Sequence, residues 1–163
     1  MKYRYLLIDN DNTLMDFHAA EHAALREALT EAGIEPTDAV CARYSAINDA
    51  LWKALERGET THAALKIARF AQLLEEYPAE NVCAPRLALR YSHYLGTHAE
   101  LMPGAEAFLR RLHGQMKIVL VSNGDSVIQR NRLFRCVFTP LLDNIVISSE
   151  KGVSKPDPRL IEI

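Results

Sequence analysis

Two aspartates, spaced two residues apart, lie directly behind the first apolar run of the chain. The run Tyr5–Ile8 is followed by Asp9 and Asp11, and then by the hydroxyl of Thr13. Four apolar residues in a row are typical of a buried strand in a parallel sheet, and open α/β sheets bind ligands at the carboxyl ends of such strands. Two carboxylates that converge there repel each other unless a cation is held between them. We therefore expect a divalent metal, a phosphate ligand, or both beside these aspartates.

Polar groups also follow two later apolar runs. Residues 117–121 and 144–147 predict two more buried strands; Ser122 and Asn123 come directly after the first, and Lys155 lies in the loop after the second. In a parallel sheet with helical crossovers, these strand ends lie at one edge of the sheet. A nucleophilic carboxylate, a hydroxyl with backbone amides and a cation together suit phosphoryl transfer, because an anionic nucleophile reaches a phosphate only when their repulsion is cancelled.

This chemistry predicts a role for each of the five residues. Asp9 attacks phosphorus to form an aspartyl-phosphate, while Asp11 protonates the leaving oxygen and later takes a proton from the hydrolytic water. Ser122 and the backbone amides near Asn123 hold phosphate oxygens, helped by the start of the following helix. Lys155 neutralises charge and restrains Asp9. The sequence therefore predicts a phosphoryl-transfer site.

A long helical stretch separates the first predicted strand from the second. Over about eighty residues, apolar side chains recur at helical spacing, which predicts four helices. Gly33 and Gly58 are in positions to end the first and second helices, while Thr37 and then Thr60 or Thr61 are in positions to cap the starts of the second and third. This stretch is expected to form a compact helical module inserted after the first strand.

The strand pattern returns after the helical module. Pro103 is in position to start a helix over residues 105–112, and a short helix is expected after the second strand. We expect an α/β fold with a doubly wound, Rossmann-like parallel sheet. Residues 1–15 and 100–163 form this core in the prediction, and residues 16–99 form an α-helical cap inserted into it.

The composition restricts the class of protein. With 163 residues, 48% of them hydrophobic and 25% charged, the chain is an ordinary globular sequence. A net charge of −2 without a block of Lys or Arg predicts no nucleic-acid partner, and no apolar run is long enough to cross a membrane. The odd cysteine count (Cys41, Cys83 and Cys136), without a signal peptide, favours buried thiols in a reducing compartment. A cytoplasmic location is therefore expected.

Three segments of the chain resemble, in order, the first three motifs of the haloacid dehalogenase superfamily of phosphohydrolases. They are Asp9-Asn10-Asp11-Asn12-Thr13, the strand end Ser122-Asn123-Gly124, and Gly152-Val153-Ser154-Lys155-Pro156. The helical module between the first two resembles the α-helical cap of one subgroup. Within it, residues 44–53, residues 57–61 and the pair Arg69-Phe70 resemble the cap of a group of pyrimidine 5′-nucleotidases.

The resemblance implies magnesium-dependent hydrolysis of a small phosphate ester, and the resemblance of the cap implies a pyrimidine nucleoside monophosphate as the substrate. It places magnesium on the carboxylate of Asp9 and on the main-chain carbonyl of Asp11. Members of the superfamily continue through a fourth strand ending in aspartates that complete the metal site, and this strand pairs with the first one. No acidic pair follows a later strand here, and Glu150 and Asp157 are poor substitutes by position. We therefore expect weak magnesium binding, slow hydrolysis by the 163-residue chain, and an open strand edge that favours a homo-oligomer.

Several alternatives compete with this hypothesis. One alternative is a sugar-phosphate or other small-phosphate hydrolase, which would use the same mechanism. Another is a non-catalytic remnant that acts as an oligomer and catalyses no reaction. Dehalogenation is disfavoured, because it needs neither an acid/base at Asp11 nor magnesium. A calcium loop is excluded because Leu14 occupies the position where glycine is required. Trp52 and Phe70 are expected in the core of the helical module rather than at a substrate-stacking surface.

Overall fold

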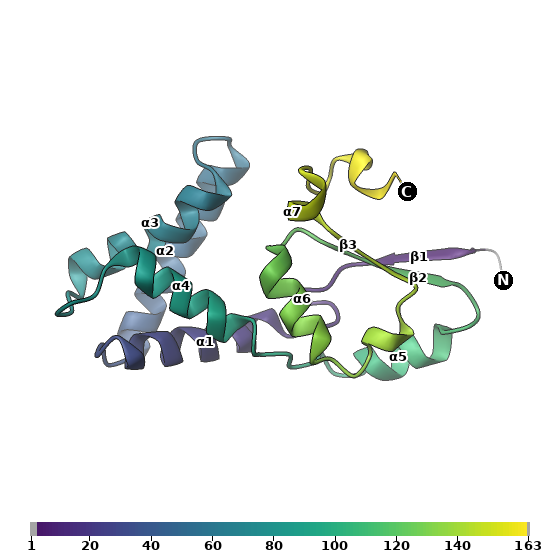
Figure 1. The fold of residues 1–163 in the computed structure, drawn as a ribbon, viewed down its shortest axis with the longest axis horizontal. Helices are drawn as coiled ribbons and strands as arrows, with labels where there is room; N and C mark the ends of the chain where they lie inside the picture. The colour runs from purple at the N-terminus through teal and green to yellow at the C-terminus, as the bar shows by residue number, and fades with distance from the viewer. Residues whose placement is uncertain (1–2, 163) are drawn as a thin grey trace. The chain divides into compact units, whose positions relative to one another are not determined.

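A three-stranded parallel sheet forms the centre of the computed structural model, which describes residues 3–162. Its strands lie in the order β1 (Tyr5–Ile8), β2 (Lys117–Ser122) and β3 (Asn144–Ile147) (Figure 1). Leu6 pairs with Ile118, and Ser122 pairs with Ile147, so the carboxyl ends of the three strands lie at the same edge. The predicted α/β fold with a parallel sheet is confirmed, and all three predicted strands are present.

The two faces of the sheet bury different side chains, as the alternation along a strand requires. On one face, Ile118 and Leu120 belong to a core cluster with Leu109 of α5 (Ala105–Leu112) and Leu133 of α6 (Ser126–Phe134). On the other face, three valines of β2 and β3 pack against Leu160 of the 3₁₀ helix η2 (Pro158–Ile161). Each fully buried aliphatic side chain stabilises the fold by roughly 1.5–3 kcal/mol. This packing fixes the strand ends that carry the predicted site.

Two short elements complete this part of the chain, and the predicted helix over residues 105–112 is present as α5, although Pro103 does not start it. The short elements are the 3₁₀ helix η1 (Thr139–Leu141) and the one-turn helix α7 (Ser148–Lys151). Helix α5 does not begin at Pro103: its N-cap is Gly104, which has a left-handed φ of 82°. Glycine adopts this conformation more readily than any other residue, so the backbone freedom of Gly104 rather than the ring of Pro103 directs the start of the helix.

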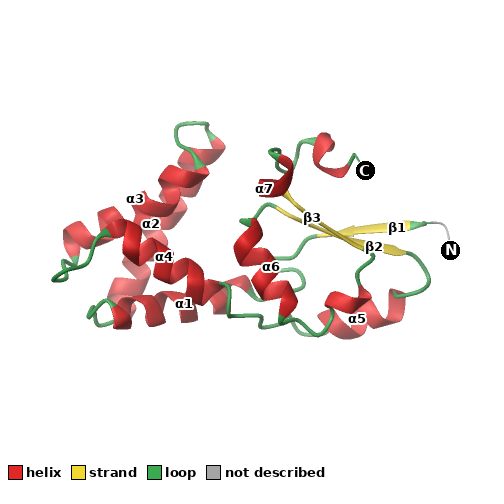
Figure 2. Cartoon of the chain, in the orientation of Figure 1, coloured by secondary structure: helices red, strands yellow, loops and turns green. Residues whose placement is uncertain are grey.

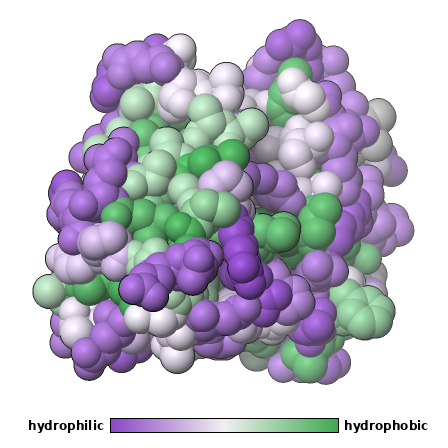
Figure 3. Space-filling model, turned by 60° about the vertical axis from the view of Figure 1, so that its left-hand side comes forward, coloured by the Kyte–Doolittle hydropathy of each residue, from purple (hydrophilic) through white to green (hydrophobic). Residues whose placement is uncertain are grey.

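Strand β1 lies at one edge of the sheet and leaves apolar side chains uncovered. Tyr5 and Leu7 are 61% and 46% exposed, and no other strand among residues 3–162 pairs with the second side of β1. In the view of Figure 3, apolar residues reach the surface among polar ones. Uncovered strand edges can pair with another chain, so the homo-oligomer proposed from the sequence stays a prediction.

The helical stretch folds as predicted into four helices, shown in red in Figure 2. Thr37 and Thr61 cap two of them, because their hydroxyls accept hydrogen bonds from the amides of Val40 (3.3 Å) and Ala64 (3.2 Å). The elements are α1 (Phe17–Glu31), α2 (Asp38–Glu56), α3 (His62–Glu76) and α4 (Ala84–Leu95).

Aromatic side chains from three helices form the centre of this helical part. The ring of Tyr44 in α2 lies 5.3 Å from that of Phe70 in α3 and 5.8 Å from that of Tyr91 in α4, measured between centroids. All three are fully buried, so the expectation that Phe70 is a core residue is confirmed. The same expectation for Trp52 is wrong: it is 37% exposed and lies edge-on to His62. Helical periodicity marks a face of the helix but does not say how deeply each position is covered.

The described chain divides into two compact units. One consists of Met1–Glu21 and Gly96–Ile163, and the other of His22–Leu95. The division falls within α1, so this helix leads from the first unit into the second. Cys41 and Cys136 are buried free thiols as expected, whereas Cys83 is exposed. No helix in the described residues is long and apolar enough to span a membrane.

Candidate active site

The loop after β1 turns sharply and separates the two aspartate side chains. The carbonyl oxygen of Asn10 accepts hydrogen bonds from three successive amides, those of residues 13–15, at 2.8–3.2 Å. Asn12 adopts a left-handed φ of 58°, and its side-chain oxygen accepts from the amides of Phe17 and His18 at the start of α1. The chain therefore leaves the strand direction at once, and Asp9 and Asp11 have different partners.

Asp9 lies beside a cation, as the sequence predicts. The Nζ of Lys155 donates to Oδ1 of Asp9 at 2.6 Å and to the main-chain carbonyl of Val121 at 3.0 Å. The amide of Asn10 donates to the same Asp9 oxygen at 2.8 Å. The Asp9 side chain remains 46% exposed, so a ligand can reach it. The structure thus brings together an accessible carboxylate and an ammonium group from segments 146 residues apart.

Asn123 holds the loop that carries Lys155. Its side-chain nitrogen donates to the carbonyl of Lys155 at 3.0 Å, and its side-chain oxygen accepts from the amide of Lys155 at 2.7 Å. The Lys155–Pro156 peptide bond is cis. Both ends of the Asn123 side chain are used in this way. A contact between Asn123 and phosphate would therefore have to come from its main-chain amide, as is expected from the sequence for the amides near this residue.

Ser122 presents an unused hydroxyl at the end of β2. The residue is 1% exposed, and its Oγ has no hydrogen-bond partner among the described residues. A buried hydroxyl without a partner is costly, and a ligand oxygen would relieve that cost. The predicted contact between Ser122 and phosphate stays a prediction.

Two side chains of helix α6 bind the Asp11 carboxylate, and these contacts were not predicted from the sequence. Gln129 donates from Nε2 to Oδ2 of Asp11 at 2.7 Å, and Arg132 forms a salt bridge to Oδ1. The two side chains lie three residues apart and so share one face of the helix. The signal in the sequence that could have identified these two residues is the spacing of two long polar side chains on one helix face, shortly after Ser122-Asn123-Gly124.

The start of α6 does not offer free amides to a phosphate, contrary to expectation. Asp125 caps the helix, and its Oδ1 accepts from the amides of Val127 (3.0 Å) and Ile128 (3.2 Å). The amide of Ser126 donates to Oγ of Ser149 at 2.8 Å. An acidic cap also places negative charge where the helix dipole would otherwise attract an anion. Helix α6 therefore supports the site through Gln129 and Arg132 instead.

The acids nearest in sequence to Lys155 are engaged in ion pairs. Arg130 hydrogen-bonds Glu150, and Arg159 hydrogen-bonds Asp157, with closest contacts of 2.8 and 2.6 Å. These hydrogen bonds are the main reason that the pKa of each carboxyl lies below its ordinary value. Each acid is therefore already neutralised by a neighbouring arginine and is a poor candidate metal ligand.

The described residues fit magnesium only in part. Magnesium prefers six oxygen ligands and is commonly held by one or two carboxylates together with phosphate and water. Asp9 has an accessible carboxylate, but the Asp11 side chain is hydrogen-bonded to α6, so the only contribution left to Asp11 is the predicted one of its main-chain carbonyl. Within residues 3–162, no group of three or more His, Cys, Asp or Glu side chains could hold a metal. The predicted metal ligands are therefore a partial set.

A parallel sheet with a helical insertion after β1, an Asp-Lys pair and a buried serine at its carboxyl edge define a class of hydrolase. The chain belongs to the haloacid dehalogenase-like hydrolase family, which it matches over residues 3–163. The resemblance noted from the sequence motifs is confirmed, as is the prediction of an enzyme lineage.

Individual relatives are similar along nearly the whole chain. HAD-hydrolase YfnB of Bacillus subtilis is 36% identical over 155 residues, covering 95% of this chain and 66% of the relative. Pyrimidine 5′-nucleotidase PynA of Streptococcus pneumoniae is 34% identical over 163 residues, covering 99% and 68%. A crystal structure of YfnB, described as bound to magnesium, superposes with a TM-score of 0.91 at 34% identity, covering 98% of this chain and 70% of that one. The chain thus spans about two thirds of the length of the curated relatives it matches.

Proposed function

We propose that this protein is a phosphomonoester hydrolase that acts through an aspartyl-phosphate and prefers pyrimidine nucleoside 5′-monophosphates. The observation that carries the proposal is the Asp9–Lys155 pair, an exposed carboxylate 2.6 Å from an ammonium group at the carboxyl edge of the sheet. Support for the substrate class comes from relatives named pyrimidine 5′-nucleotidase, at 34% and 28% identity.

In the first step, a carboxylate oxygen of Asp9 attacks phosphorus. The new bond forms as the bond between phosphorus and the ester oxygen breaks, and Asp11 supplies the proton that this oxygen needs to leave. Lys155 cancels part of the repulsion between Asp9 and the phosphate, and the Ser122 hydroxyl donates to a phosphate oxygen.

In the second step, Asp11 takes a proton from water while the water oxygen attacks phosphorus. The bond between phosphorus and Asp9 breaks, which releases phosphate and restores both carboxyl groups. Magnesium, when bound to Asp9 and the Asp11 carbonyl, would offset further negative charge on the phosphate. We propose this dependence because the described residues provide part of its ligand set and a structure of the related YfnB is described as bound to magnesium.

The test measures phosphate release by the full-length protein, with magnesium, from four substrates. These are uridine 5′-monophosphate, adenosine 5′-monophosphate, glucose 6-phosphate and phosphoserine; the last is included because a phosphoserine phosphatase of Thermus thermophilus is 28% identical over 184 residues. We expect the highest kcat/KM with the uridine nucleotide. Preference for glucose 6-phosphate or phosphoserine would replace the proposed substrate while leaving the proposed reaction in place.

The nucleophile is tested by Asp9→Asn. We expect a loss of kcat on the order of a thousandfold or more, because the amide oxygen cannot form the acyl-phosphate. Asp49→Asn, at an exposed position of α2, is the matched control and should retain full activity. Turnover by Asp9→Asn at the rate of the control would exclude Asp9 as the nucleophile.

A further inference from the structure

Both carboxylate oxygens of Asp11 receive a hydrogen bond from a buried side chain of α6. Gln129 is 3% exposed and Arg132 is fully buried, whereas the Asp11 side chain is 28% exposed. An aspartate at a loop surface would otherwise rotate freely about its side-chain torsions and spend time turned toward water. Here its orientation is set from two sides.

Gln129 and Arg132 are in turn held by second contacts. Gln129 accepts through Oε1 from the side-chain nitrogen of Asn10 at 2.7 Å, and Arg132 donates through Nε to the carbonyl of His98 at 2.9 Å. The guanidinium of Arg132 also lies 5.7 Å from the ring centre of Phe17. Asn10 is fully buried, so the chain from Asn10 to Gln129 to Asp11 is anchored in the core at its far end. Acid/base residues are commonly oriented by a hydrogen-bonding partner, and that partner is commonly held in place by a further contact.

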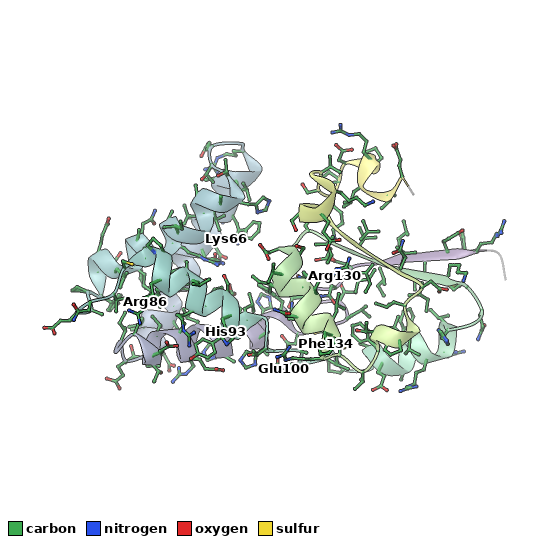
Figure 4. All side chains as sticks on the ribbon, viewed as in Figure 1. Lys66, Arg86, His93, Glu100, Arg130 and Phe134 are labelled. Carbon is green, nitrogen blue, oxygen red and sulfur yellow. The ribbon has the colours of Figure 1, made fainter. Side chains whose placement is uncertain are left out.

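Gly124 leaves the space through which Gln129 reaches Asp11. A Cβ at position 124 would lie 2.6 Å from Cγ and 2.7 Å from Nε2 of Gln129, closer than real contacts allow. The φ of Gly124 is not positive, so the requirement for glycine here is steric and concerns this one side chain. The opposite side of α6 has no such role: Arg130 is exposed and pairs with Glu150 (Figure 4).

We propose that Gln129 and Arg132 are positioning residues that aim the Asp11 carboxyl at the leaving oxygen, and that Gly124 is required because Gln129 must pass over it. This inference rests on the proposed acid/base role of Asp11. Neither residue touches substrate in the proposal; each acts through Asp11. Gln129 and Arg132 contribute by orienting Asp11. Correct orientation can supply a large part of the reduction in activation free energy when a reacting group must approach along one direction.

Substrates with different leaving groups distinguish a role in positioning Asp11 from a role in stabilising the fold alone. An alkyl ester such as a nucleoside monophosphate needs a proton on its leaving oxygen, while p-nitrophenolate leaves without one. A variant that misplaces Asp11 therefore slows formation of the aspartyl-phosphate selectively for the alkyl ester, whereas the second step uses Asp11 as a base with both esters. A variant that only loosens the fold loses both activities together.

The experiment uses Gln129→Ala, Gly124→Ala and the double variant in the full-length protein, with Gln115→Ala as the control at an exposed glutamine. The kcat/KM, which reports the steps up to departure of the leaving group, is measured for uridine 5′-monophosphate and for p-nitrophenyl phosphate, and thermal unfolding is followed for each variant. For both single variants we expect roughly a tenfold or larger loss with the nucleotide and less than about a threefold loss with the aryl ester. In the Gln129→Ala background, Gly124→Ala should cause no further loss, because the side chain with which its methyl collides is gone.

Arg132→Lys and Arg132→Met extend the test to the second partner. Lysine keeps a charge that can reach Asp11, so Arg132→Lys should retain more nucleotide turnover than Arg132→Met, with the aryl ester again the less affected substrate. Equal losses with both esters, or fully additive effects of the Gly124 and Gln129 changes, would overturn the proposal. A wild-type protein inactive on both esters would instead overturn the proposed function, and the inference with it.

Discussion

At the scale of single residues, the side chains of the candidate site differ in how far the protein already satisfies their hydrogen bonds. Asp9 accepts from Lys155 yet stays half exposed, and Ser122 keeps a buried hydroxyl without a partner among the described residues. Asn123 uses its side chain to position the Lys155 backbone, which places the ammonium group rather than leaving it on a mobile loop. In the proposed reaction, the ammonium group of Lys155 lowers the cost of bringing a doubly charged phosphate to the Asp9 carboxylate.

Lys155→Met tests that electrostatic role. We expect kcat/KM to fall by about 10²–10³, because the nucleophile and phosphate would repel each other without the ammonium group. Lys151→Met removes an exposed lysine four residues away and should leave the rate unchanged. Equal rates for the two variants would show that Lys155 does not act on the reacting groups.

At the scale of elements, α3 contributes a buried cation to the helical unit. Arg69 is 6% exposed, donates to the side-chain oxygen of Asn48 at 3.1 Å, and lies 4.6 Å from the ring centre of Tyr91. It also lies 5.2 Å from the ring centre of Phe70 and 5.8 Å from that of Tyr44. Three aromatic faces around a guanidinium offset part of the cost of burying its charge. The pair Arg69-Phe70 therefore connects α3 to the helices on both sides.

Arg69→Met should destabilise this unit by about 1–3 kcal/mol, since the apolar stem is kept while the cation–π contacts and the hydrogen bond are lost. For a chain of this size that corresponds to a fall in Tm of roughly 2–4 °C per kcal/mol. Arg86→Met, at an exposed position of α4 labelled in Figure 4, is the matched control and should change Tm little. Matching Tm values for the two variants would contradict the role given to Arg69.

At the scale of the whole molecule, the helical insertion leaves the sheet and returns to it through paired segments. The amide of Asp16 donates to the carbonyl of Glu100, and the amide of Met102 donates to the carbonyl of Leu14, each at 2.9 Å. Met15 and Leu101 form an antiparallel bridge between them. Both ends of the insertion are thus fixed to each other beside the Asp9–Asp11 loop. Loop-closure entropy grows only slowly with the length of an insertion, so these contacts can offset the cost of bringing its two ends together.

Ion pairs within the helical unit predict how stability depends on pH. A hydrogen bond from Tyr94, followed by one from Arg90, lowers the pKa of Glu31, and a hydrogen bond from Arg43 lowers that of Glu76. A lowered pKa means that each carboxylate stabilises the fold fully above its ordinary value of 4.5, and that this stabilisation is lost as the pH falls through the lowered pKa. The pairs are exposed, so each effect is small.

Thermal unfolding of wild type and Glu76→Gln between pH 7 and pH 3 tests this dependence. The variant should have the lower Tm at pH 7, and the difference should shrink as the pH falls below about 4.5. Glu75→Gln removes the neighbouring exposed carboxylate and should show no such convergence. A difference between wild type and Glu76→Gln that stays constant over the whole range would contradict the predicted ion pair.

Features that depend on neighbouring residues could be predicted from the sequence. The apolar runs of β1, β2 and β3 identified the strands, and the hydroxyls of Thr37 and Thr61 identified two helix starts, because strands and caps depend on neighbouring residues. The Asp9–Lys155 pair could also be expected, since parallel strands bring their carboxyl ends to one edge wherever they lie in the chain.

The directions of the remaining side chains depend on tertiary packing. Gln129 and Arg132 resemble solvent-facing residues of a short helix in the sequence, and they become buried because Asp11, more than a hundred residues earlier, receives their hydrogen bonds. Trp52 fits an apolar face yet stays exposed, and Asp125 occupies the helix start expected to bind phosphate. Burial and hydrogen-bond partners depend on which distant segment packs opposite a residue, and that choice is made when the core closes.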